Sequence, residues 1–244
     1  MRGDKILVQD AHHRAAAAIS RILFPSLTRI NAKFAVSIGG ESGSGKSELA
    51  VATSEALEKQ GIGTLILQQD DYFVYPPKTN DIRRRQDISR VGLAEVHLDL
   101  LDEHVRSFLS GATTIDKPLV VYQDDRIMNE TLQLSGVDVV IVEGTYTTLL
   151  KNVNSRIFID RSYEQTRAAR LKRKREPPDH FLDRVLEIEH SIISGHKCLA
   201  DIIVTSSLAV VTQVPRGETR NYPVKNESLS KEVINEEDQH RAKQ

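Results

Sequence analysis

Residues 34–50 read FAVSIGGESGSGKSELA, and this stretch decides the fold. A short apolar run ends at paired glycines, and a helix-forming segment begins at Lys46. Between them, residues 40–47 match the pattern G-x-x-x-x-G-K-[ST] at every defined position. Glycines let the backbone curl so that successive N–H groups face one anion, and the following helix adds the positive end of its dipole. The stretch therefore predicts a phosphate-binding loop between a strand and a helix.

The loop predicts the cofactors as well as the local structure. We expect Lys46 to reach the β- and γ-phosphates of ATP, and the Ser47 hydroxyl to ligate Mg²⁺. The alternative is a glycine- and serine-rich turn that contains Lys-Ser by chance, but the strand before it and the helix after it favour a nucleotide site. The residues expected to bind the cofactor are Gly40, Glu41, Ser42, Gly43, Ser44, Gly45, Lys46 and Ser47.

Apolar strand-like runs alternate with helical segments along the rest of the chain. Such alternation is typical of βαβ units, in which helices cover both faces of a mostly parallel sheet. We therefore predict an α/β fold of the three-layer αβα P-loop NTPase type, with a mostly parallel central sheet and a helical lid. The expected strands lie at 34–38, 64–67, 118–122, 137–142, 156–159 and 200–204, and the expected helices at 4–23, 46–60, 93–109, 163–175 and 180–195.

The composition argues against several classes of protein. The 244 residues include 33 Lys and Arg against 34 Asp and Glu, so no global charge attracts nucleic acid or an anionic membrane surface. No run approaches the roughly 20 apolar residues that span a bilayer. The single cysteine, Cys198, cannot form an internal disulfide or a cysteine-based metal site. We expect a cytoplasmic protein without nucleic-acid or membrane partners, and the oligomeric state stays open, a homo-oligomer included.

Two further strand ends carry acids. Residues 139–144, VVIVEG, place Glu143 at the end of an apolar strand, where nucleotide-binding proteins carry the acid that organises the metal. We expect Ser47 and Glu143 to be the metal ligands; a surface Glu at a strand end is the alternative. Asp70 and Asp71 follow the second strand-like run. A carboxylate there could accept the proton of an attacking hydroxyl, but paired acids are also common in turns.

Basic residues gather in two stretches. Residues 167–175, RAARLKRKR, place Arg167, Arg170 and Lys174 on one helix face. A basic helix that closes over ATP would offset the charge on the transferred phosphoryl group, whereas a solvated face or a nucleic-acid patch is the alternative. The arginines at 83–85 indicate either an anionic acceptor, because arginine binds carboxylate and phosphate well, or a solvated loop.

Taken together, these segments resemble the uridine kinase/phosphoribulokinase family of P-loop kinases. The likeness spans roughly residues 34–205, and it implies ATP-dependent transfer of the γ-phosphoryl group to a hydroxyl of a small molecule. The matching segments are VSIGGESGSGKSELA (36–50), LILQQDDYF (65–73), VVIVEGTY (139–146), IDRSYEQTRAARLKR (159–173) and HKCLADIIV (196–204).

The resemblance also implies a role for each matching residue. Asp70 stands at the family's general-base position, Glu143 at the acid near Mg²⁺, and Arg167 and Arg170 at lid arginines. The expected catalytic residues are therefore Lys46, Asp70, Glu143, Arg167 and Arg170, and the residues expected to contact the acceptor are Asp70, Tyr72 and Arg84.

The acceptor half departs from the family pattern. Uridine kinases usually carry a Pro-x-Tyr-Asp segment followed by Thr-His-x-Arg, whereas Pro118 is followed here by LVVYQDDR, without a histidine. A kinase for a sugar phosphate or an acidic sugar, and a non-catalytic ATP-binding regulator, therefore stand beside a uridine kinase-like enzyme. We expect an N-terminal helical extension at 1–33, a P-loop kinase domain at 34–214 and a polar C-terminal tail at 215–244.

Overall fold

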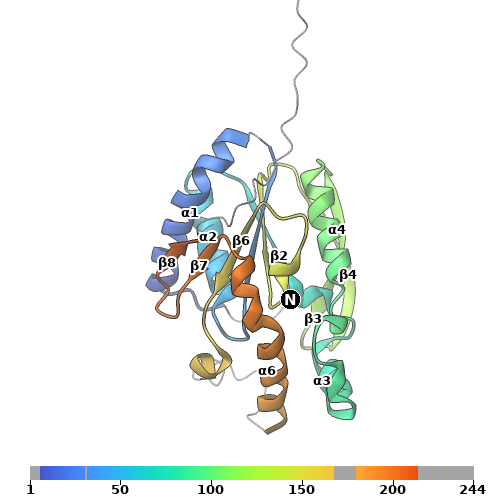
Figure 1. Cartoon of the computed structure of the whole chain (residues 1–244). Coiled ribbons are helices and arrows are strands. Elements are labelled where there is room, and N and C mark those ends of the chain that lie inside the picture. The colour runs from blue at the N-terminus through green and yellow to red at the C-terminus, as the bar shows by residue number, and fades with distance from the viewer. Residues whose placement is uncertain (1–5, 31, 168–179, 214–244) are drawn as a thin grey trace, which may run out of the picture.

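The central feature of the computed structural model is a six-stranded sheet (Figure 1). The model describes residues 6–30, 32–167 and 180–213. The strand order is β2-β5-β1-β6-β7-β8, and every neighbouring pair is parallel except the last. This confirms the predicted α/β fold with a mostly parallel sheet. The strands are β1 Phe34–Gly40, β2 Thr64–Gln68, β5 Val139–Glu143, β6 Ser155–Ile159, β7 Ile202–Val204 and β8 Val210–Thr212.

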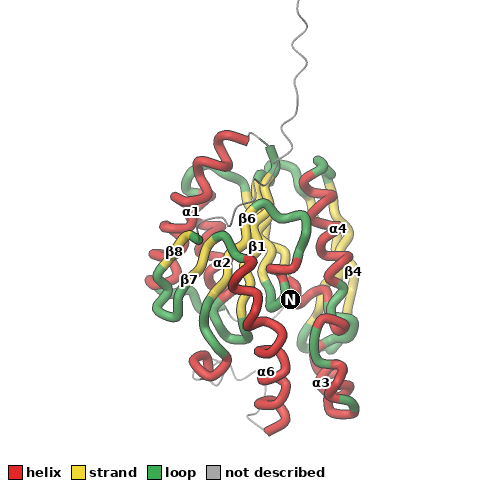
Figure 2. The backbone as a smooth tube through the Cα atoms, in the orientation of Figure 1, coloured by secondary structure: helices red, strands yellow, loops and turns green. Residues whose placement is uncertain are grey.

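Helices cover both faces of this sheet (Figure 2). Side chains of a strand point alternately to its two faces, so Val139 and Ile141 pack with α1 (Asp10–Ile30) and α2 (Lys46–Glu58). Val140 and Val142 pack on the opposite side, in the cluster that includes α4 (Leu98–Leu109) and the end of α6 (His180–Ile193). Burial on both faces explains why the central strands are continuously apolar. None of the helices among the described residues is long and apolar enough to cross a membrane.

An antiparallel hairpin stands apart from the main sheet. It pairs β3 (Thr114–Val121) with β4 (Arg126–Gln133). The run at 118–122 was expected among the strands of a single sheet, but it belongs to this hairpin. The sequence analysis missed β4, because its face away from the core is exposed and its sequence, RIMNETLQ, has no apolar run. It also missed β8, which forms the sheet edge.

The first helix differs most from its prediction. It begins at Asp10 and continues through Pro25 to Ile30, whereas a helix over 4–23 ending at Pro25 was expected. A proline inside a helix removes one hydrogen bond. Here Ile19 and Leu23 are buried against the sheet and α2, and this packing stabilises the helix across that position. The helix of the expected extension at 1–33 therefore shares the core of the P-loop domain.

The other helical segments correct several boundaries. The helix expected over 93–109 begins at Leu98, because residues 93–95 form a separate 3₁₀ turn. The arginines at 83–85 lie in α3, Pro77–Gln86, and not in a loop. Residues 168–179 and 214–244, which include much of the expected lid and the whole tail, lie outside the described residues. The 3₁₀ turns are Gln69–Tyr72, Ile88–Arg90, Leu93–Glu95, Thr147–Leu149 and Ser194–Leu199.

One glycine marks a close approach of two backbone segments. Gly63 precedes β2, and its carbonyl accepts hydrogen bonds from the N–H groups of Asp138 and Val139 at the start of β5. A Cβ atom at Gly63 would lie 1.8 Å from the carbonyl oxygen of Gly136. The two segments can therefore meet only where residue 63 has no side chain.

We expect Gly63→Ala to lower the free energy of unfolding by about 2 kcal/mol, because backbone atoms must move apart to admit the methyl group. Urea denaturation measures the change. Gly195→Ala is the matched control, since a Cβ atom there meets nothing within 4 Å, and it should change the free energy by less than about 0.5 kcal/mol. Equal effects of the two substitutions would contradict the close approach.

Candidate active site

The glycine-rich loop joins the sheet to α2. It leaves the end of β1, and α2 begins at Lys46. Gly43 has a φ of 74° and Gly45 a φ of 103°, which other residues rarely adopt, so the backbone can curl at these points. The Lys46 ammonium donates a hydrogen bond to the carbonyl oxygen of Glu41 at 2.9 Å and so lies across the loop. The strand–loop–helix arrangement predicted from the sequence is therefore present.

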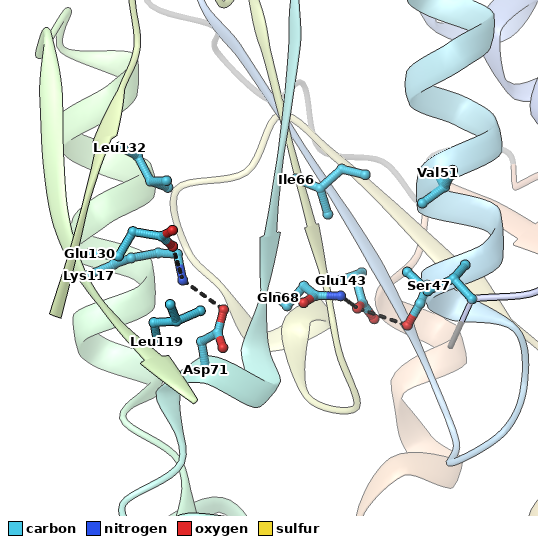
Figure 3. Close-up of a pocket in the computed structure, with 11 residues that line it drawn as sticks. Ser47, Val51, Ile66, Gln68, Asp71, Lys117, Leu119, Glu130, Leu132 and Glu143 are labelled. Carbon is cyan, nitrogen blue, oxygen red and sulfur yellow. Dashed lines mark hydrogen bonds and ion pairs between the residues drawn. The ribbon is translucent and has the colours of Figure 1, made fainter. Parts of the chain in front are cut away.

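The predicted metal ligands lie together beside this loop. The Ser47 hydroxyl donates to Oε1 of Glu143 at 2.9 Å, and the Gln68 amide donates to the same oxygen at 3.2 Å (Figure 3). Parallel pairing explains the contact, since β1 and β2 both flank β5 and their carboxyl ends meet at one edge of the sheet. Glu143 is buried, with 5% of its surface exposed. It is not the surface residue of the alternative interpretation.

The surroundings of Glu143 disfavour its negative charge. Burial and the nearby Asp70 carboxylate raise its pKa to about 7, against the opposing effects of Lys46 and the Ser47 hydrogen bond. Because it is buried beside a second acid, a cation at this point would stabilise the ionised form. Oxygen donors of this kind suit Mg²⁺, which takes few protein ligands and completes its shell with water and phosphate oxygens.

A cavity of about 160 Å³ lies next to the loop. Asp70, from the turn after β2, lines it together with Ser42 of the loop, so a carboxylate and the phosphate-binding backbone face one space. The other walls come from α3, α6 and the hairpin turn, and include Asn80, Arg84, Tyr122, Phe181 and Glu189. The structure thus brings Asp70 and Arg84, both of which were expected to contact the acceptor, to a common cavity.

Two carboxylates bind the guanidinium of Arg84. Its Nε and Nη2 donate to the two oxygens of Glu95 at 2.6 and 2.8 Å, and Nη2 also donates to Glu189 at 3.2 Å. Burial alone would lower the pKa of Arg84, but the hydrogen bond to Glu95 and the charge of Glu189 raise it above its usual value. Arg84 lines the cavity as one member of a charge network, so the solvated interpretation fails for this residue, whereas Arg83 and Arg85 are exposed.

The adjacent acids at 70 and 71 have separate surroundings. Asp71 is buried and accepts hydrogen bonds from Lys117 Nζ at 2.7 Å and from the N–H of Val120 at 3.0 Å, so it fastens the hairpin to the turn. Lys117 also lies 3.5 Å from Glu130, and these three residues line a second cavity of about 360 Å³ (Figure 3). Of these two adjacent acids, Asp70 alone lines the cavity beside the loop.

Tyr72 does not line the cavity beside the loop. Its side chain is fully buried, and its hydroxyl lies 2.8 Å from Nδ1 of His104 on α4. The expectation that Tyr72 contacts the acceptor is therefore corrected: the turn after β2 directs this ring into the core, where it packs with Leu101 and Val105. Its neighbour Phe73 lines the cavity instead.

The expected lid lies only partly within the described residues. Arg167 is exposed at the end of a helical stretch that begins at residue 163, whereas Arg170 lies outside the described residues. The Thr166 hydroxyl donates to the carbonyl oxygen of Ser42 at 2.9 Å. The chain segment that carries Arg167 is thus attached to the phosphate-binding loop.

Sequence reasoning missed two residues that touch this loop. His12 is buried on α1, and its Nε2 lies 3.3 Å from the point where a Cβ atom would stand on Gly45. The Glu41 side chain pairs with His190 of α6. No local pattern signals either contact, because each partner is distant in the chain.

The central strand, the curled glycine loop and the helix behind it, with a carboxylate at the end of the neighbouring strand, define a P-loop α/β protein. The chain belongs to the Phosphoribulokinase / Uridine kinase family, whose model matches residues 35–192.

Individual relatives differ in the acceptor that their names state. The chain is 29% identical over 192 residues to the bifunctional alpha-galactosidase/sucrose kinase AgaSK of Mediterraneibacter gnavus, covering 73% of this chain but only 20% of that protein. It is 26% identical over 192 residues to a uridine kinase of Lactiplantibacillus plantarum, covering 69% and 85%. A putative fructose transport system kinase from Silicibacter sp. TM1040 shares the fold, with a TM-score of 0.57, 17% identity and coverage of 75% and 93%.

The buried His104 makes stability depend on pH. Burial lowers the pKa of His104 in the folded chain, whereas the unfolded chain takes up that proton near pH 6.5, about the usual histidine value. The contribution of His104 to the free energy of unfolding is therefore fully present above the unfolded-state pKa. It is lost as the pH falls through the lower folded-state pKa. Between about pH 7.5 and 5, we expect the free energy of unfolding to fall less in His104→Gln than in the wild type, as measured by urea denaturation.

The control is His180→Gln, which replaces an exposed histidine at the start of α6. Its pH dependence should match that of the wild type. If His104→Gln also kept the wild-type pH dependence, the burial of His104 would not control the pH dependence of stability.

Proposed function

We propose that this protein is a kinase that transfers the γ-phosphoryl group of MgATP to a hydroxyl of a small molecule. The observation that carries the proposal is that Asp70 and Ser42 line one cavity. A carboxylate that faces the same space as the phosphate-binding loop can accept a proton from a hydroxyl placed between them. Phosphoryl transfer to an alcohol requires this arrangement, and it distinguishes a kinase from an ATP-binding regulator.

Each part of the site then has a function. The backbone of residues 40–47 holds the triphosphate, and Lys46 offsets its charge. Ser47 and Glu143 are the residues that would hold Mg²⁺, which would neutralise negative charge on the phosphates. Asp70 orients the acceptor hydroxyl and accepts its proton. Catalysis here depends mainly on positioning and electrostatics, since phosphoryl transfer leaves the protein little covalent chemistry to perform.

The charges around the cavity support an uncharged acceptor. Four carboxylates lie in or against its walls, those of Asp70, Asp81, Glu95 and Glu189, and the cations described beside them are Arg84 and Arg85. Arg84 is held by Glu95 and Glu189, and Arg85 donates to Asp81 at 2.8 Å. A phosphate or carboxylate on the acceptor would face this negative excess.

We therefore favour a polyhydroxyl compound without charge, a free sugar or a nucleoside, over the sugar phosphate or acidic sugar of the alternative hypothesis. Hydroxyl groups can donate to carboxylates such as Asp70 and Glu189 and accept from Asn80. Relatives named as uridine kinase and sucrose kinase are consistent with this class, and both names state an uncharged acceptor.

We expect Lys46→Ala to reduce ATP-dependent phosphorylation at least about 100-fold, because the phosphates lose a preorganised cation. Coupled detection of ADP with the purified chain measures turnover. Lys59→Ala, at the exposed far end of the same helix, is the matched control and should keep wild-type activity. Normal turnover by Lys46→Ala would refute the assignment, and ATP binding without turnover on any acceptor would favour a regulator.

We also expect uncharged sugars or nucleosides to exceed their phosphate esters by about 100-fold in kcat/KM, because like charges placed together cost several kcal/mol. A panel of sugars, nucleosides and their phosphates, tested under identical conditions, measures this ratio. Asp81→Asn removes one carboxylate from the cavity wall and should narrow the ratio, whereas Asp99→Asn, exposed on α4, should not. Preference for the phosphate esters would overturn the uncharged acceptor.

A further inference from the structure

Glu41 occupies a position of the phosphate-binding loop where its charge is unfavourable. The loop binds anions, so a carboxylate directed at the nucleotide would repel it. The side chain is instead buried, with 6% of its surface exposed, and it is bound by two partners that follow it by more than 120 residues. An acid inside an anion-binding loop therefore needs an explanation, and the two partners of Glu41 supply one.

Both carboxylate oxygens of Glu41 are engaged. Oε2 accepts a hydrogen bond from the backbone N–H of Tyr163 at 2.5 Å, and Oε1 lies 2.7 Å from Nδ1 of His190. Tyr163 opens the helical stretch that leads to Arg167, and His190 lies on α6. One loop side chain thus joins the loop to two separate segments.

Neighbouring contacts strengthen both connections. The Thr166 hydroxyl donates to the carbonyl oxygen of Ser42, the residue after Glu41, at 2.9 Å. The rings of Tyr163 and His190 lie 5.6 Å apart, centre to centre, and so fill the space between the two segments. These contacts leave little freedom for residues 163–166 to move relative to the loop.

The same part of α6 reaches the cavity that Asp70 and Ser42 line, which we call the acceptor cavity. Glu189, adjacent to His190, lines that cavity and accepts a hydrogen bond from Arg84 at 3.2 Å. Two consecutive residues of one helix therefore face the two substrate sites, Glu189 the acceptor cavity and His190 the phosphate-binding loop. Because a helix is stiff over two residues, α6 connects the two sites mechanically.

We propose that Glu41 is a positioning residue that fixes residues 163–167 and α6 against the phosphate-binding loop, so that Arg167 is carried to the nucleotide. This inference rests on the proposed kinase function, because it takes the loop to be the ATP site. Glu41 acts through its two hydrogen bonds and not by touching the nucleotide. Nucleotide affinity should therefore depend on the two carboxylate oxygens of Glu41, while the acceptor cavity keeps its own contacts.

The test compares nucleotide binding by the full chain with MgADP as the probe in calorimetry. We expect Glu41→Ala to weaken MgADP binding about 10-fold, because misplacing the segment lowers the population of the competent geometry. Glu41→Gln keeps an oxygen that can accept from Tyr163 and should lose less than about threefold. Glu55→Ala, which removes a half-buried acid on α2 that pairs with His13, is the matched control and should bind as the wild type does.

The outcomes separate this inference from the function on which it rests. Absence of MgADP binding by the wild type would refute the nucleotide site itself. Wild-type binding with equal affinity in Glu41→Ala, or equal losses in Glu41→Ala and Glu41→Gln, would overturn the positioning role alone.

A second variant covers the case in which Glu41→Ala does not fold. His190→Ala removes one of the two partners from a side chain that is 42% exposed, so the fold should tolerate it. We expect it to weaken MgADP binding about threefold while the KM of the acceptor changes less than twofold. Unchanged MgADP affinity in folded His190→Ala would likewise overturn the proposal.

Discussion

The parallel pairing of β1 with β5 is the constraint on which the site depends. Its register places Ile38 beside Glu143, so the glycine-rich loop leaves the sheet at the level where the acid of the neighbouring strand ends. Because β2 pairs with the other side of β5, Gln68 and the turn that follows it arrive at the same edge. An antiparallel pairing in any of these positions would send one of the groups to the opposite end of the sheet.

Charged residues that are neighbours in the sequence have different charge partners in this arrangement. Asp71 is paired with Lys117 in the interior and holds the hairpin, whereas Asp70 stands near Glu143 and helps to raise its pKa. Arg84 belongs to a network with two carboxylates, so its positive charge is offset before any ligand arrives. A cation at the loop would relieve the excess of negative charge around Glu143, as the MgATP site that we propose requires.

The helices α1 and α6 contact the phosphate-binding loop in addition to covering the sheet. The buried His12 of α1 approaches the loop near Gly45, and α6 connects the loop to the acceptor cavity through consecutive side chains. Segments before and after the central βαβ units therefore shape the geometry of the phosphate-binding loop. The first helix accordingly shares a core with α2 and the sheet.

The sequence by itself determined the phosphate-binding loop and the mostly parallel strands around it, and it singled out Ser47 and Glu143, because the glycine spacing and the apolar strand ends are local signals. The residue pattern alone did not distinguish Asp70 from Asp71, which only the family resemblance separated. It revealed neither the burial of Tyr72 nor the strand β4, whose exposed face carries no apolar signal. Those outcomes depend on partners that lie far away in the chain, such as Lys117 for Asp71 and His104 for Tyr72. Only the tertiary structure decided them, because a side chain's burial and charge partner are set by which distant segment packs against it.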